Sequence, residues 1–118
     1  MLREFLRGAA QVHVLHHAAE GDVYGAWMAG ELRRHGYEIS PGTLYPMLHR
    51  MEETGLLVSR GEVAEGRTRR LYAATDAGRS QLALVRAAVA ELADEVLPAG
   101  ERPKRRRREP TRAEGGKA

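Results

Sequence analysis

The chain has 118 residues, a formal net charge of +3 and no cysteine. A chain of this length forms one small domain with a modest core, which favours association into a dimer, and the lack of cysteine excludes disulfides and thiolate metal sites. No apolar run reaches the roughly 18 residues of a membrane span, so we expect a cytoplasmic protein that makes no membrane contact.

The positive charge is concentrated at the C-terminus. Residues 98–118 contain eight Lys or Arg and three acidic side chains, whereas residues 1–97 contain eleven basic and thirteen acidic ones. Because the part expected to fold is slightly acidic, overall charge does not by itself indicate nucleic-acid binding. Residues 98–118, rich in Pro, Gly and charge, are predicted to be a disordered basic tail. The tail is either simply solvated or an arm that adds non-specific affinity for phosphate.

Two helices are predicted first, over residues 2–19 and 24–35. Side chains recur along the first at the spacing of one helical face. This predicted arc comprises Leu2, Phe5, Leu6, Ala9, Val12, His13 and His16. The second helix is expected to bury Met28 and Leu32. Trp27 points away from both, so it either packs against a neighbouring helix or contacts an effector or DNA.

A histidine-rich segment on the first helix has the spacing of a metal site. His13, His17 and Glu20 are four and three residues apart and therefore share a helical face. Neutral imidazoles with a carboxylate suit zinc or a related divalent ion, and two such faces could complete a site across a dimer. Alternatively, His13 and the neighbouring His16 are hydrogen-bonded histidines of the apolar arc.

A third helix is predicted from Ser40, a candidate N-cap, and Pro41, at the first helical position, to a stop at Gly55. Its buried side comprises Leu44, Met47, Leu48 and Met51. Its outward side comprises Gly42, Tyr45, Pro46, His49, Arg50 and Glu53. Pro46 removes a backbone hydrogen bond inside the helix, which taken alone indicates a kinked core helix.

A basic hairpin follows this helix. Residues 56–63 and 69–74 read as strands joined by a glycine-containing turn over residues 64–68. Four arginines are expected around its tip: Arg60, Arg67, Arg69 and Arg70. A helix with a small polar outward face beside a basic ribbon suits entry into the DNA major groove with additional phosphate contacts.

A fourth helix is predicted from the N-cap Thr75 to Leu97. Five apolar residues in it alternate at spacings of three and four, as in a coiled-coil seam. They are Leu82, Val85, Val89, Leu92 and Val96. A dimer seam and packing within one chain both remain open for this face.

Over roughly residues 5–97 the chain resembles the PadR family of bacterial transcriptional regulators. The most specific match is the string SPGTLYPML at residues 40–48. The other matching strings are Tyr24-Gly25, Arg50-Met51-Glu52, Gly55-Leu56-Leu57, Arg70-Leu71-Tyr72 and Thr75-Asp76-Ala77-Gly78.

The resemblance implies a mainly α fold with a two-stranded β-wing. Residues 1–75 would form a winged helix-turn-helix DNA-binding domain, and residues 76–97 the single C-terminal dimerisation helix of the short family members. The first and last helices would hold a homodimer that represses a promoter containing an inverted repeat. An effector, either a small molecule or a divalent metal ion, would release it. The last helix has no aromatic residue to stack a flat ligand.

The resemblance also implies which residues contact DNA. Tyr24 would contact phosphate, and the wing would contribute Arg67, Arg69 and Arg70. The residues in or beside the groove would be Ser40, Thr43, Tyr45, Pro46 and His49. Because the family has a proline at the position of Pro46, the kinked-core interpretation is weakened.

No catalytic constellation is present in the sequence. The chain lacks a glycine-rich phosphate loop and a cysteine nucleophile, so we expect neither an enzyme nor a resident cofactor. The alternative to a DNA-binding regulator is a winged-helix protein interaction module without sequence-specific DNA binding, which the slightly acidic fold permits.

Overall fold

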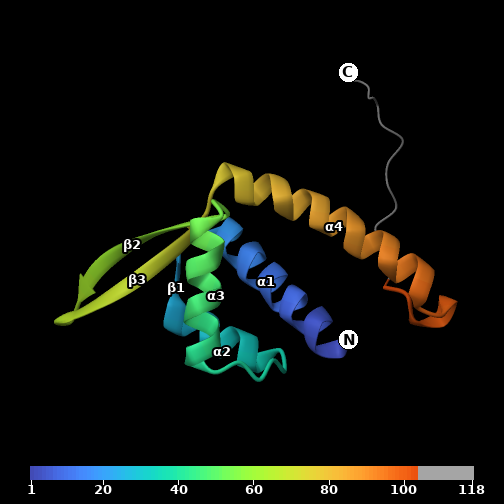
Figure 1. Cartoon of the computed structure of the whole chain (residues 1–118), viewed down its shortest axis with the longest axis horizontal. Coiled ribbons are helices and arrows are strands. Elements are labelled where there is room, and N and C mark those ends of the chain that lie inside the picture. The colour runs from blue at the N-terminus through green and yellow to red at the C-terminus, as the bar shows by residue number, and fades with distance from the viewer. Residues whose placement is uncertain (104–118) are drawn as a thin grey trace, which may run out of the picture. The chain divides into compact units, whose positions relative to one another are not determined.

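The computed structural model describes residues 1–103. The chain divides into one unit of residues 1–87 and a second unit that begins at Ala88. The elements in chain order are α1 (Leu2–Glu20), β1 (Val23–Tyr24), α2 (Gly25–Arg34), α3 (Pro41–Glu53), β2 (Leu57–Ala64), β3 (Arg67–Ala74), α4 (Asp76–Val96) and the 3-10 turn η1 (Ala99–Glu101). Helix α4 crosses the boundary between the units (Figure 1). Within residues 1–103, no helix is long and apolar enough to cross a membrane.

The predicted mainly α fold with a β-wing is confirmed, but the sheet has three strands rather than two. Strand β1 pairs antiparallel with β3, with Val23 opposite Tyr72 and Tyr24 opposite Leu71, so the strand order is β1-β3-β2. Two residues are too few to show strand alternation, and β1 exists because β3 offers it a free edge. In Figure 1 the β2–β3 hairpin extends away from α1, α2 and α3.

The wing turn is shorter than predicted. Strands β2 and β3 pair in register up to Ala64 and Arg67, so only Glu65 and Gly66 form the loop. Both have positive φ angles, 54° and 75°, as a two-residue hairpin turn of type I′ requires. The wing therefore continues as paired strands almost to its tip.

The core of residues 1–87 lies between the helices and the sheet. Helix α3 contributes its predicted apolar side, namely Leu44, Met47, Leu48 and Met51, all buried. The arc predicted for α1 is only partly buried: Leu2, Phe5 and Leu6 are exposed, whereas Val12 packs against the core. The residues that α1 buries fully are Ala10, Val14, Leu15 and Ala18. The buried face of α1 is therefore centred away from the predicted arc.

Two predicted helix starts differ in how they are capped. Ser40 occupies the N-cap position of α3 without a side-chain capping bond. The Thr75 hydroxyl accepts a hydrogen bond from the Gly78 N–H at 2.9 Å and donates one to the Gly55 carbonyl at 2.5 Å. Thr75 thus joins the start of α4 to the turn that ends α3.

The predicted tail begins too early. At Pro98 the chain enters the η1 turn, in which the Glu101 N–H donates to the Pro98 carbonyl at 2.8 Å. The Arg102 side chain donates from Nε to the Leu97 carbonyl at 3.0 Å. Hydrogen bonds to these two carbonyls, directly after the end of α4, account for the local order. The rest of the predicted tail, residues 104–118, lies outside the described residues.

Candidate nucleic-acid interface

The N-terminus of α2 and the outward side of α3 meet through a close aromatic contact. Gly25 begins α2, and a Cβ atom at Gly25 would lie 2.8 Å from Cε1 of the Tyr45 ring. Only glycine leaves room for the ring to lie against this backbone. Sequence reasoning found Tyr45 but attached no role to Gly25, whose value appears only when the two helices pack.

Five of the predicted DNA-contacting residues share one open groove of about 690 Å³. They come from β1, α3 and β3: Tyr24, Tyr45, Arg67, Arg69 and Arg70. The pairing of β1 with β3 places Tyr24 beside the wing, and the contact with Gly25 holds Tyr45 at the other wall. The groove therefore combines two tyrosine side chains with the arginines of the wing.

The wing arginines face solvent. Arg67, Arg69 and Arg70 are all exposed and, within residues 1–103, none of the three forms an ion pair. Arg60 differs, because it lies in the middle of β2 and pairs with Asp22 at 2.7 Å. It is therefore not at the tip as predicted, and its charge is already compensated by the fold.

Tyr24 is held by its neighbours on the sheet. Its hydroxyl donates a hydrogen bond to Glu62 on β2, which raises the pKa of the tyrosine above its usual value. The Arg69 guanidinium lies over the Tyr24 ring, with its carbon 5.3 Å from the ring centroid. Glu62, which sequence reasoning missed, thus fixes the tyrosine in the groove.

The remaining predicted residues lie outside this groove but are exposed on or next to α3. Ser40 is 3.4 Å from Thr43, hydroxyl to hydroxyl, and Thr43 lines a different groove beside the first turns of α1. Pro46 faces solvent while α3 stays helical from Pro41 to Glu53. His49 pairs with Glu53 at 3.3 Å.

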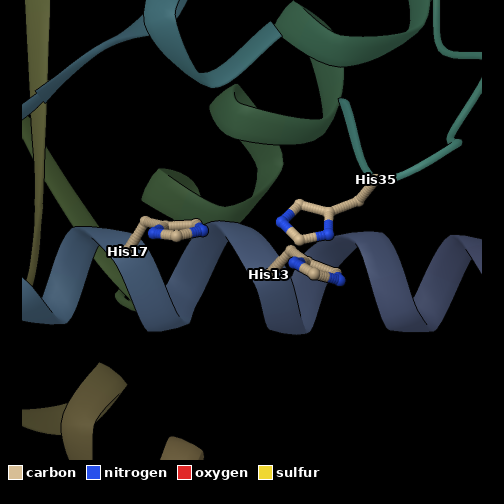
Figure 2. A group of neighbouring side chains, drawn as sticks. All are labelled: His13, His17 and His35. Carbon is tan, nitrogen blue, oxygen red and sulfur yellow. The ribbon is translucent and has the colours of Figure 1, made fainter. Parts of the chain in front are cut away.

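The predicted metal set is not assembled as such. His13 and His17 lie with His35, at the end of α2, and their ligand nitrogens are within 4.8 Å of one another (Figure 2). Glu20 instead groups with His16 and His17. His35 was missed because it is distant in the sequence and approaches only when α2 packs on α1.

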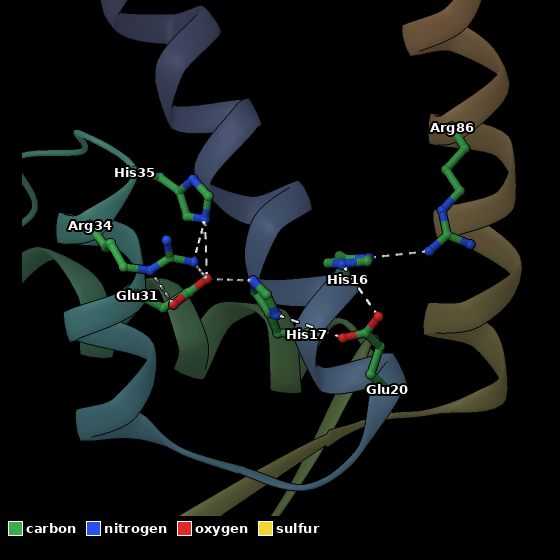
Figure 3. A network of polar contacts seen from close by, with 7 residues as sticks. All are labelled: His16, His17, Glu20, Glu31, Arg34, His35 and Arg86. Carbon is green, nitrogen blue, oxygen red and sulfur yellow. Dashed lines mark hydrogen bonds and ion pairs between the residues drawn. The ribbon is translucent and has the colours of Figure 1, made fainter. Parts of the chain in front are cut away.

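Two of these histidines, His17 and His35, contact a carboxylate on α2. Glu31 is 9% exposed and accepts hydrogen bonds from Arg34 at 2.8 and 3.1 Å and contacts His17 and His35 (Figure 3). Hydrogen bonding by Arg34, with a further contribution from His35, lowers the Glu31 pKa to about 2. Trp27 packs edge-on against His17 at 5.2 Å between ring centroids, which supports the interpretation that it packs on a neighbouring helix.

Comparison with known proteins decides the family. The model of the transcriptional regulator PadR-like family matches residues 14–84. The transcriptional regulator Rv3488 of Mycobacterium tuberculosis is 59% identical over 96 residues, which cover 81% of this chain and 90% of that protein. The chain belongs to the PadR family. It is therefore a DNA-binding transcriptional regulator and not an enzyme.

Crystal structures of other PadR proteins share the fold. A PadR family regulator from Eggerthella lenta has a TM-score of 0.72 at 35% identity, covering 81% of this chain and 85% of its own. A PadR-like regulator from Bacillus cereus also has a TM-score of 0.72, at 27% identity, covering 79% of this chain and 92% of its own. The matched shares are large enough to include the whole winged helix.

One residue of the predicted dimer seam of this PadR protein belongs to its own core. Leu82 is 2% exposed and packs in the core of residues 1–87, which corrects its assignment to the seam. Val85 is partly buried. Val89, Leu92 and Val96 are exposed, at 54%, 42% and 61%. The apolar face of α4 is therefore divided between the core near its start and solvent further on.

Proposed function

We propose that the chain is a homodimeric repressor that binds an inverted repeat in a promoter and is released by an effector. The observation that carries the proposal is the groove that Tyr24, Tyr45, Arg67, Arg69 and Arg70 line together. In a winged helix, the recognition helix enters the major groove while the wing follows the phosphate backbone. Here α3 would contact base edges, and the wing arginines would contact phosphates and so position the protein on the DNA.

Residues on two helices support a dimer. The exposed apolar side chains of α4, including Leu92, would be covered by a second copy, as would Leu2 and Phe5 at the start of α1. In the dimer, two α3 helices separated by about 34 to 36 Å would fit half-sites one helical turn apart. A small change in their separation would weaken both contacts together, which is how an effector would release the DNA.

The distribution of charge indicates that the wing is needed for binding to DNA phosphates. Residues 1–97 have a net charge of −2, so within these residues affinity for phosphate must come from local arginines. Three wing arginines per chain give six in a dimer, and this predicts a slope of roughly −5 for log K against log salt concentration. The groove, rather than the global charge, supplies the electrostatic attraction.

The test is a nuclease footprint of the full chain on its own upstream region at physiological salt. We expect two protected half-sites related by a two-fold axis, and competition by random DNA only at large excess. Protection of neither half-site, with no shift of this DNA in a gel, would support the alternative of a protein interaction module. Protection of one half-site by a monomer would refute the dimer but not DNA binding.

A further inference from the structure

The histidine cluster on α1 and α2 has the donor atoms of a metal site. Nε2 of His17 lies 3.4 Å from Oε2 of Glu31, and Nε2 of His35 lies 3.1 Å from the same oxygen. Two ligand atoms on one tetrahedral zinc ion are separated by roughly 3.3 Å, given metal–nitrogen bonds of about 2.0 Å. Both histidine nitrogens are thus already at coordination spacing from the Glu31 oxygen.

A third histidine completes the set. The ring of His13 is 4.7 Å from that of His35, and ligand nitrogens of His13, His17 and His35 all lie within 4.8 Å of one another. His13 is therefore the nearest further histidine to supply a fourth ligand. We propose that His13, His17, Glu31 and His35 bind one divalent transition-metal ion per chain, with zinc as the representative ion.

The protonation states suit this chemistry. Burial, with the neighbouring histidines, lowers the pKa of His13 and of His17, so both imidazoles are neutral and have a free lone pair near pH 7. Glu31 is ionised there. Histidine and carboxylate ligands are those of the borderline divalent metals. The geometry, rather than these shifts, carries the assignment.

Arg34 is the competitor for this site. Its guanidinium neutralises Glu31 through Nε and Nη2, at 3.1 and 2.8 Å. Arg34 is 68% exposed at its side chain, so it can turn into solvent when a cation takes its place. Arginine and metal ion would then bind the same carboxylate alternately, and removing the arginine should favour the metal.

Glu20 takes a different role from the one predicted for it. It lies on the Nδ1 side of His17, with its carboxylate oxygen 3.9 Å away, while Nε2 of His17 points to Glu31. Ligating histidines commonly have a carboxylate on the second ring nitrogen, which orients the ring. Glu20 therefore lies on the side of His17 away from Glu31 and is not assigned as a ligand.

A second cluster is less suited to bind a metal ion. It consists of His16, His17 and Glu20. Its ion-pair distances are 3.6 and 3.9 Å, and Nδ1 of His16 lies 3.3 Å from an Arg86 guanidinium nitrogen. A nearby permanent cation opposes the binding of a metal ion. This cluster provides a direct control, because His16 belongs to it alone.

The metal would connect α1 to the segment that leads into α3. His35 is the C-cap of α2, and Gly36 starts the short connection to Pro41 at the beginning of α3. Binding would hold the end of α2 against α1 and thereby restrict the orientation of the recognition helix. This regulatory consequence rests on the proposed function, whereas the site itself does not.

The experiment is a Co²⁺ titration of the full, metal-free chain, followed by displacement with Zn²⁺. We expect an intense visible absorption typical of tetrahedral Co²⁺, saturating at one ion per chain. His35→Gln should weaken binding at least about 100-fold, as loss of a ligand exceeds the usual cost of losing an outer partner. His16→Gln should leave the affinity unchanged, and Arg34→Gln should raise it by roughly 10-fold.

Several outcomes would overturn the assignment. They are a weak octahedral spectrum, a loss of affinity in His16→Gln with none in His35→Gln, or no gain in Arg34→Gln. The gain of affinity in Arg34→Gln keeps the test valid should His35→Gln fold poorly. Gel shifts of the promoter DNA, run with a chelator that removes metal ions, test DNA binding separately. Failure of the metal site can therefore be distinguished from failure of the proposed repressor function.

Discussion

Replacing Gly25 with Ala should lower the affinity for DNA and leave the free energy of unfolding nearly unchanged. The new methyl group would lie 2.8 Å from Cε1 of Tyr45, about 1 Å inside the usual carbon–carbon contact distance, so one of the two must move. Tyr45 is the mobile partner because it is 41% exposed and the three atoms nearest the new methyl group all belong to its side chain. We therefore expect the ring to turn away from the groove while the fold remains intact.

The magnitudes follow from two opposing terms. Ala in place of helical Gly stabilises by up to about 1 kcal/mol, and relieving the contact costs a similar amount, so the free energy of unfolding should change by less than about 1 kcal/mol. Losing a base contact by Tyr45 costs roughly 1–3 kcal/mol per half-site. DNA affinity should therefore fall at least about 10-fold at nearly constant stability.

The assay is a gel shift on the footprinted operator, combined with urea unfolding of the same preparations. Gly30→Ala is the matched control in α2, because its Cβ would meet nothing closer than 4.0 Å. It should raise stability by about 0.5–1 kcal/mol and leave DNA binding unchanged. The double variant Gly25→Ala with Tyr45→Ala should bind no more weakly than Tyr45→Ala alone. Additive losses would refute the idea that Gly25 acts through Tyr45.

Three further changes test other parts of the molecule. Thr75→Ala removes both the cap of α4 and the bond to Gly55, so urea unfolding should show a loss of about 1–2 kcal/mol; an unchanged midpoint would contradict the capping role. Arg67→Ala should reduce the salt slope of DNA binding by roughly 2 per dimer and weaken random and specific DNA alike, whereas a loss on the operator alone would identify a base contact. Leu92→Glu should shift the chain to monomers in sedimentation experiments and leave its helix content unchanged, and a persistent dimer would place the seam elsewhere.

The site was partly predictable because local strings encode parts of it. Tyr24, Tyr45 and the three wing arginines were named from the sequence, and all five line one groove. The sequence could not show that Arg60 is paired with Asp22 or that Glu62 accepts the Tyr24 hydroxyl. Both contacts join residues about 38 positions apart, and no local periodicity reports on such pairs.

The sequence by itself determined what depends on neighbours along the chain. The buried side of α3, the N-cap at Thr75 and the paired wing follow from helical spacing, a hydroxyl before a helix, and a glycine turn between strands. These features are local because each hydrogen bond or apolar stripe involves residues only a few positions apart.

Only the tertiary structure decided which side chains are buried, which remain exposed to solvent and which distant residues meet. Packing buried Leu82 in the core, left Leu2, Phe5 and Leu6 at the start of the α1 arc exposed, and created β1 on the free edge of β3. It also brought His35 and Glu31 to the histidines of α1, while Glu20 groups with His16 and His17. The physical reason is that burial and ligand distances depend on how α1, α2 and the sheet are oriented toward each other, and that orientation is set by long-range close packing.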